Sequence, residues 1–395
     1  MVWVRLITSF LGLLLTLSSH ASLHFEISGK LSTQLQVFTQ EALYSGQNQN
    51  HNQSFTAEPI FHWEWNEGND SIRFLPFFRV DEHDSERQHG DIRELYWNHV
   101  GQDWELRIGV RQEFWGVTEF RHLVDVINQT DTVEDIDGED KLGQPMINLS
   151  LVENWGVLDL YVLPGFRERT FPGLSERLRG PVVVDRSQTR YSSNDWRRDI
   201  DLAIRWSHTL GIVDLGLHGF HGSNREPQLQ LAEIDTQSVL SPFYEQMNQI
   251  GLDTQVTLDS WLWKFETIWR DTESGTYWAS QLGFEYIFYG VADSTTDIGV
   301  ILEYGWDKNA ENSSAQSQNT LFLGARFTLN DVDSKEMLLS VDYPGKSLFV
   351  QVNRRLHQRW TVSIDGKFFN AKDNHDILYD LRNDDHIQLT VEYFL

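Results

Sequence analysis

The chain has 395 residues, no cysteine, 15 tryptophans and a formal net charge of −26 at pH 7. The absence of cysteine excludes disulfide bridges and thiol chemistry, and the strong acidity argues against nucleic acid as a partner. After the first 21 residues no stretch is apolar over the ~20 residues that a membrane-spanning helix needs.

The N-terminal 21 residues predict a cleaved signal peptide. Arg5 supplies a positive charge, Leu6 to Leu17 form a short apolar run, and Ser19 and Ala21 are small residues that fit a cut near Ala21. A membrane anchor is the alternative, but the apolar run is short for one. We therefore expect residues 22–395 to form a single exported domain.

From residue 23 onward, apolar and polar residues alternate in many separate segments. In the last of them Ile387, Leu389 and Val391 lie on one face, and Gln388 and Thr390 lie on the other. Alternation with a period of two predicts a β-strand with one apolar face. The segments are residues 23–38, 59–65, 72–80, 93–97, 104–110, 145–152, 156–163, 198–208, 211–220, 245–258, 260–270, 277–289, 296–306, 319–328, 335–343, 347–356, 359–369 and 386–395.

The connections between these segments alternate between short and long. This is typical of an outer-membrane barrel, which has short periplasmic turns and long extracellular loops. We predict an all-β fold, a transmembrane antiparallel β-barrel of about 18 strands, in which the last strand pairs with the first. Two outer connections are shorter than expected, so 16 strands are possible. High tryptophan and tyrosine content fits the aromatic belts at the two membrane interfaces.

Two long connections, 113–144 and 164–197, are expected at the outer mouth or folded inward. The first has an apolar stretch from Phe120 to Ile127, which predicts packing rather than exposure to solvent. We expect it to narrow the channel, and the alternative is a lid across the mouth. The candidate constriction residues are Trp115, Gly116, Arg121, Asp125 and Asn128.

The polar faces of the predicted strands carry charges of both signs. In a barrel these faces line the interior, either as a network of ion pairs that braces the wall or as a pore that selects solutes. Because both signs are present, no ion preference is predicted. The candidate pore-lining residues are Arg73, Arg79, Glu105, Arg107, Arg111, Asp201, Arg205, Asp214, His218, Lys264, Glu266, Glu285, Glu303, Asp365 and Lys367.

Three further patterns in the sequence bear on possible chemistry. The acidic segment 131–140 superficially suggests calcium but lacks the EF-hand spacing, and a solvated loop is favoured. His221 and Ser223 are two residues apart on one strand, which does not place a base in hydrogen-bond reach of a nucleophile. We therefore expect no metal, no cofactor and no enzymatic activity. Arginines on and directly after the 164–197 connection are expected to contact lipopolysaccharide phosphates or nearby acids: Arg167, Arg169, Arg177, Arg179, Arg197 and Arg198.

The segment Trp104–Gln112, followed by Trp115-Gly116 and then by Asp125 and Asn128, resembles porin-like families of Gram-negative outer membranes. These include a poorly characterised family of large barrels and, distantly, the alginate-export type. In those families an Arg-x-Gly-Arg-Gln-like strand end precedes Trp-Gly and an Asp-x-x-Asn-Pro-x-Asp run. Here Val110 interrupts the spacing of the strand end, and Gln129 stands where proline is usual. The resemblance implies a passive or selective channel and brings no catalytic residues.

The expected function is a channel of the cell outer membrane for small solutes. A non-conducting barrel, acting as a receptor, an adhesin or an accessory of an export system, is the alternative, and an outer-membrane hydrolase is a third. The expected partners are outer-membrane lipid and lipopolysaccharide, small solutes, and the barrel-assembly machinery through the C-terminal strand.

Overall fold

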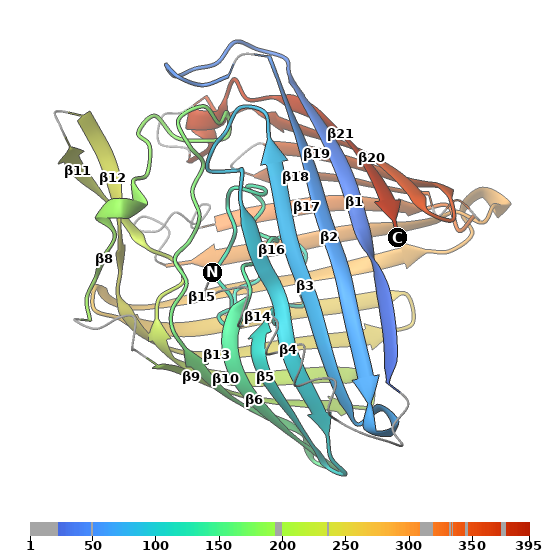
Figure 1. The fold of residues 1–395 in the computed structure, drawn as a ribbon. Helices are drawn as coiled ribbons and strands as arrows, with labels where there is room; N and C mark the ends of the chain where they lie inside the picture. The colour runs from blue at the N-terminus through green and yellow to red at the C-terminus, as the bar shows by residue number, and fades with distance from the viewer. Residues whose placement is uncertain are drawn as a thin grey trace.

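The computed structural model describes residues 23–48, 50–193, 200–234, 237–308, 319–331, 333, 335–343, 347–372 and 377–395. The signal peptide predicted at 1–21 lies outside these residues. Eighteen strands form one closed antiparallel sheet, as predicted, and β1 (His24–Phe38) pairs with β21 (His386–Phe394) from Lys30–Phe394 to Phe38–His386 (Figure 1).

Each remaining barrel strand pairs with the barrel strand before it and the barrel strand after it along the chain. Three further strands lie outside the barrel and form a small second sheet. The strands are β2 (His51–Trp65), β3 (Asp70–Asp81), β4 (Gly90–Val100), β5 (Trp104–Arg111), β6 (Gln144–Glu153), β7 (Gly156–Pro164), β9 (Ile200–Leu210), β10 (Val213–Ser223), β13 (Gln246–Leu258), β14 (Trp261–Thr272), β15 (Gly275–Phe288), β16 (Asp297–Asp307), β17 (Asn319–Thr328), β18 (Glu336–Tyr343), β19 (Ser347–His357) and β20 (Trp360–Phe369).

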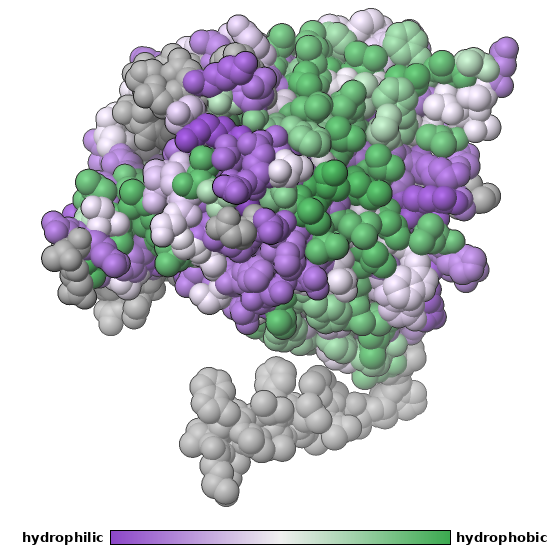
Figure 2. Space-filling view, turned by 90° about the horizontal axis from the view of Figure 1, so that it is seen from above, coloured by the Kyte–Doolittle hydropathy of each residue, from purple (hydrophilic) through white to green (hydrophobic). Residues whose placement is uncertain are grey.

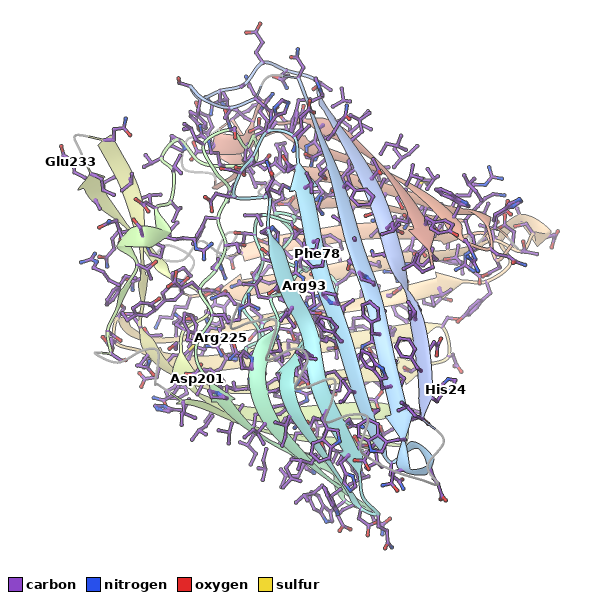
Figure 3. All side chains as sticks on the ribbon, viewed as in Figure 1. His24, Phe78, Arg93, Asp201, Arg225 and Glu233 are labelled. Atoms are coloured by element: carbon purple, nitrogen blue, oxygen red, sulfur yellow. The ribbon has the colours of Figure 1, made fainter. Side chains whose placement is uncertain are left out.

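The outside of the barrel is apolar. Phe78 on β3 and Leu282 on β15 are more than half exposed, and Phe78 is labelled in Figure 3. Figure 2 shows a hydrophobic band over the flank, with hydrophilic residues gathered on either side of it. A closed sheet satisfies every backbone group in its wall, so this exterior suits a lipid bilayer. The described residues contain no helix with the length and apolar character to cross a membrane.

Aromatic residues gather at both ends of the outer face, as expected for interface belts. Near the short turn between β13 and β14, the Trp261 ring stacks on that of Trp263, with centroids 5.5 Å apart, and lies 4.6 Å from the ring of Tyr286 on β15. Toward the opposite end of these strands, Trp269 of β14 lies directly across from Trp278 of β15 in the strand pairing.

A second sheet extends beyond the barrel. It contains β11 (Gln228–Ile234), β12 (Gln237–Tyr244) and β8 (Arg190–Tyr191), and Figure 1 shows the β11–β12 hairpin projecting from the long-loop end. We expected an outer loop at 221–244. Alternating Gln228-Leu229-Gln230-Leu231 could have revealed the strand, but it is short and lies beyond the barrel wall.

β2 begins earlier than predicted, at His51 rather than Pro59. Its first residues pair with β1, from Val37–His51 onward. His51 and Gln53 are polar where the outer face of the wall is elsewhere apolar, because this end of the strand lies above the apolar band. The alternation that marks a strand is therefore missing from the sequence there.

Candidate functional site

The connection from β5 to β6 folds into the barrel. Its apolar residues Trp115, Leu123, Val124, Val126 and Ile127 are buried, and they pack against apolar side chains on the inner wall. Burying one such side chain contributes about 1.5–3 kcal/mol, so the inward position is favoured. The wall residues of this cluster are Met146, Tyr161, Leu163, Ala203, Phe220, Met247, Ile268 and Ala279. We call residues 112–143 the inner loop.

Two wall carboxylates hold the tip of the inner loop. Glu266 on β14 accepts hydrogen bonds from the backbone N–H groups of Val117 (2.7 Å), Thr118 (3.0 Å) and Val124 (3.2 Å). Glu303 on β16 accepts from the N–H groups of the next two residues, Glu119 and Phe120, at 2.7 and 2.9 Å. Hydrogen bonds to an ionised group contribute about 1.5–3 kcal/mol each, so these two side chains anchor the loop to the wall.

The predicted constriction residues shape the inner loop itself. Asp125 accepts hydrogen bonds from the N–H groups of Trp115 (2.6 Å) and Gly116 (2.9 Å). Asn128 donates to the carbonyls of Arg111 and Leu142, both at 2.8 Å. Asp125 and Asn128 therefore stabilise the bends of the inner loop. Each one forms hydrogen bonds with backbone groups that have no partner in a neighbouring strand.

Of the other constriction candidates, Trp115 and Arg121 contact the wall, and Gly116 packs against His122 of the inner loop itself. The Trp115 ring lies 5.1 Å from that of His218 and 5.7 Å from that of Tyr161. A Cβ atom on Gly116 would lie 2.4 Å from the His122 ring, so this position requires glycine. Arg121 forms an ion pair with Asp307 at 2.8 Å.

The acidic end of the inner loop faces basic residues of the β3–β4 and β20 walls. Arg79 donates to Glu134 at 2.9 Å, Arg93 donates to Asp131 at 2.7 Å, and Lys367 binds Asp135. Burial would raise the pKa of Asp131, but the His89 hydrogen bond and the Arg93 charge lower it to about 2. This segment was expected to be a solvated loop; instead, ion pairs hold much of it against the wall.

A polar cavity of about 310 Å³ lies between the inner loop and the wall. Ser32 and Gln34 of β1 and Thr56 of β2 line one side, and Glu139 and Asp140 of the loop line the other. Burial and the neighbouring acids Glu134, Asp137 and Asp135 raise the pKa of Asp140 to about 7. The loop therefore fills one part of the barrel and leaves a space beside β1 to β4 and β21.

The predicted pore-lining residues all lie on the inward-facing side of their strands, but they have two different surroundings. One group contacts the inner loop or lies beneath it: Arg79, Arg111, Asp201, Arg205, His218, Lys264, Glu266, Glu285, Glu303 and Lys367. The other group borders the remaining space or lies nearer the short turns: Arg73, Glu105, Arg107, Asp214 and Asp365.

Several charged residues of the interior were not among the candidates. Arg326 on β17 binds Glu119 of the inner loop and Glu285 of the wall. Arg225, in the connection after β10, donates to Asp201 at 2.7 Å and to the carbonyl of Ile127 at 3.1 Å (Figure 3). Alternation along β17 places Arg326 on the inner face and could have identified it. Arg225 follows the end of a strand, so alternation gives no such signal.

A second connection crosses the outer mouth. We call residues 165–185, which follow β7, the strap. Thr170 donates to Asp131 of the inner loop at 2.6 Å, and farther along the strap the N–H of Gly173 donates to Asp84 at 2.9 Å. The strap therefore lies over the inner loop and reaches the β3–β4 connection.

Arg177, in the second half of the strap, is fully buried. Arg177 donates to Asp384 at 2.8 Å, to the Asn383 carbonyl at 2.9 Å and to the Gln40 carbonyl at 3.1 Å. Arg167 pairs with Asp91, Arg169 donates to Gln129, and Arg179 donates to the carbonyl of Ser45. Contact with lipopolysaccharide or nearby acids was predicted for these side chains, and the structure shows contacts within the protein. Arg197 and Arg198, which carried the same prediction, lie outside the described residues.

His221 and Ser223 have separate partners. The His221 ring lies 2.8 Å from the Asn248 side-chain oxygen, and the Ser223 hydroxyl accepts a hydrogen bond from Gln246 at 3.2 Å. Neither contact forms the nucleophile–base pair of a hydrolase.

The closed barrel, its apolar exterior and its inward-folded loop define an outer-membrane β-barrel of the porin type. No family model and no curated protein matches the chain.

Among solved structures, a loop L8 deletion mutant of OmpT, an outer membrane protein of Vibrio cholerae, is similar over 95% of this chain and 100% of its own, with a TM-score of 0.49 and 9% identity. OprB of Pseudomonas putida covers 94% of both chains, with a TM-score of 0.47 and 8% identity. A double mutant of the Rh. blastica porin covers 94% of this chain and 100% of its own, with a TM-score of 0.44 and 8% identity. Such identities carry no substrate over to this chain.

Proposed function

We propose that the barrel is a channel that passes small solutes between the inner loop and the wall formed by β1 to β4 and β21. The observation that carries this proposal is the polar cavity of about 310 Å³ in that position. It is lined by hydroxyl, amide and charged groups, which can replace part of the hydration of a small polar solute. The proposal includes no catalytic step.

Planar-bilayer recording on the refolded mature chain tests this function. We expect discrete current steps, and we expect larger steps after deletion of residues 113–144, because the inner loop occupies part of the bore. Heat-modifiable migration in electrophoresis would show that both proteins form barrels. No current above leak from either protein would contradict a channel.

We predict that cation preference increases with pH. Because the pKa of Asp140 is raised to about 7, this carboxyl is largely neutral at pH 6 and largely ionised at pH 8. A negative charge at the cavity then favours cations over anions. Reversal potentials measured in a KCl gradient from pH 6 to pH 8 should show the change, and Asp140→Asn should reduce it.

Asp103→Asn is a matched control, because Asp103 lies in the short turn between β4 and β5 and outside the cavity lining. It should keep the pH dependence of the wild type. An Asp140→Asn protein with an unchanged pH dependence would show that other groups set the ion preference.

The strap supports a second candidate, a barrel that does not conduct in its resting state and acts as a surface receptor, an adhesin or an export accessory. Its contacts with Asp84 and Asp384 tie it to the β3–β4 connection and to the connection that precedes β21. The same recordings separate the two functions: a closed barrel gives no current in the wild type and conducts once the strap is released.

We further propose that the barrel-assembly machinery binds β21. Before closure this strand has an unpaired edge and an alternating lipid-facing side, with Ile387 and Leu389 exposed. Contact with lipopolysaccharide also remains a proposal.

A further inference from the structure

Two histidines and a glutamate come together at the outer rim, away from the cavity. His51 is the first residue of β2, and Glu82 and His83 directly follow the end of β3. The Nε2 atoms of both histidines lie 3.7 Å from the same carboxylate oxygen, Oε2 of Glu82. The three donor atoms all lie within 4.8 Å of one another.

We propose that this rim cluster binds a divalent transition-metal ion of the Zn²⁺, Cu²⁺ or Ni²⁺ class. Imidazole nitrogens with one carboxylate oxygen suit these ions, whereas Ca²⁺ and Mg²⁺ prefer all-oxygen sites. Zn²⁺ bound tetrahedrally at its usual 2.0–2.1 Å would place its donors about 3.3 Å apart. The two His–Glu separations are 3.7 Å and the two histidine nitrogens lie within 4.8 Å of each other, so each pair of donors would have to close by at most about 1.5 Å to reach that value.

Hydrogen bonds and strand pairing hold the backbone of all three residues. His51 pairs with Val37 of β1, and the Glu82 N–H donates to the Gln53 carbonyl at 2.9 Å. The His83 N–H donates to Asp81 at 3.0 Å. Because the backbone of each residue is already held in place, no loop has to become ordered when an ion binds. The entropic cost of binding is therefore low.

The electrostatic surroundings also favour a cation. Among the described residues, no arginine or lysine lies within 4.0 Å of the Glu82 carboxylate, and the three side chains remain between 33% and 49% exposed. Water can therefore complete the coordination shell.

A second group, His89, Asp131 and Glu134, provides a contrast because its acids already bind arginines. Arg93 lies 2.7 Å from Asp131, and Arg79 lies 2.9 Å from Glu134. Two guanidinium charges would repel a metal ion there. The rim cluster, and not this buried group, is therefore the metal site.

A bound ion would join two segments of the mouth. It would connect the start of β2 to the β3–β4 connection, where the His83 carbonyl accepts a hydrogen bond from Ser175 of the strap at 2.7 Å. Binding to the folded state alone would also stabilise the barrel against unfolding.

Calorimetric titration of the refolded mature chain with ZnCl₂ at pH 7.5 tests the site, with MgCl₂ as the comparison ion. We expect one Zn²⁺ per chain, and we expect His51→Ala and His83→Ala each to weaken binding by on the order of tenfold or more. Cu²⁺ loaded into the wild type should show hyperfine coupling to imidazole nitrogen in its electron paramagnetic resonance spectrum, and the double variant should lack this coupling.

His357→Ala removes another exposed histidine, at the short-turn end of β19, and should leave Zn²⁺ affinity unchanged. Heat-modifiable migration identifies any variant that fails to fold. The proposal is overturned if the wild type binds no stoichiometric Zn²⁺, if it binds Mg²⁺ equally well, or if folded His51→Ala and His83→Ala proteins keep the wild-type affinity.

Discussion

Replacing both loop anchors, Glu266→Gln with Glu303→Gln, should greatly increase the current noise of the open channel. Both oxygens of each carboxylate accept hydrogen bonds from the loop or the wall. A glutamine has only one such oxygen, and its NH₂ group would face a backbone N–H that also needs an acceptor. At least one charge-assisted hydrogen bond is therefore lost at each position.

The loss amounts to about 3–6 kcal/mol for the two positions together, since each such bond contributes about 1.5–3 kcal/mol. A change of this size raises the detached fraction of the inner loop by roughly 10²–10⁴. Single-channel recording would show the detached state as rapid flicker. Proteinase K applied to the folded protein should also cut within residues 113–144 faster than in the wild type.

Glu94→Gln is the matched control. Glu94 lies on the inner wall and binds Arg73, so the change removes the same charge without touching the inner loop. It should leave the noise and the cleavage rate near those of the wild type. If the double variant behaved like Glu94→Gln, the apolar cluster around Val124 and Ile127 and the ion pairs of the loop with the wall would hold the loop without these hydrogen bonds.

The second large effect is expected at the strap, where Arg177→Met should release residues 165–185 from the far rim. Arg177 and Asp384 are both fully buried, and removal of one partner leaves the other charge without compensation. Breaking a buried pair in this way costs about 3–5 kcal/mol. Because the strap lies outside the strands, the cost falls on the mouth and not on the barrel wall.

Proteinase K digestion of the folded protein should therefore cut the strap at least tenfold faster in Arg177→Met, because 1.4 kcal/mol already corresponds to a factor of ten. Conductance should rise if the strap restricts entry. Arg186→Met is the control, since Arg186 is 42% exposed and its nearest acid, Glu168, is 3.9 Å away. Equal cleavage of both variants would show that the strap is held by its other contacts.

The barrel wall could be predicted from the sequence because its signal is local. In a strand such as β16, Ile298, Val300 and Leu302 face lipid while Gly299, Ile301 and Glu303 face inward, and the alternation is visible in a few residues. The inward packing of the inner loop was also signalled locally, by the apolar stretch that contains Val124 and Ile127. Those signals give the elements of the fold and the approximate strand number.

The contacts that organise the interior could not be predicted in the same way. Glu266 binds Val117, 149 residues away, and Arg177 binds Asp384, 207 residues away. Alternation places Glu266 on the inner face, but it does not reveal which part of the loop lies above it. Arg177 lies outside any strand, and its burial depends on three connections that meet only in the closed barrel.

Closure of the sheet between β1 and β21 has a consequence for the order of folding. The ion pair that joins these strands, Lys30 with Glu392 at 2.8 Å, links residues 362 positions apart. Contacts of such separation form late, because the loop-closure entropy is lost before they can form. Until then both strands keep free backbone groups that can pair with another chain. The slow step in folding, and the stage most open to aggregation, is therefore the joining of the first strand to the last.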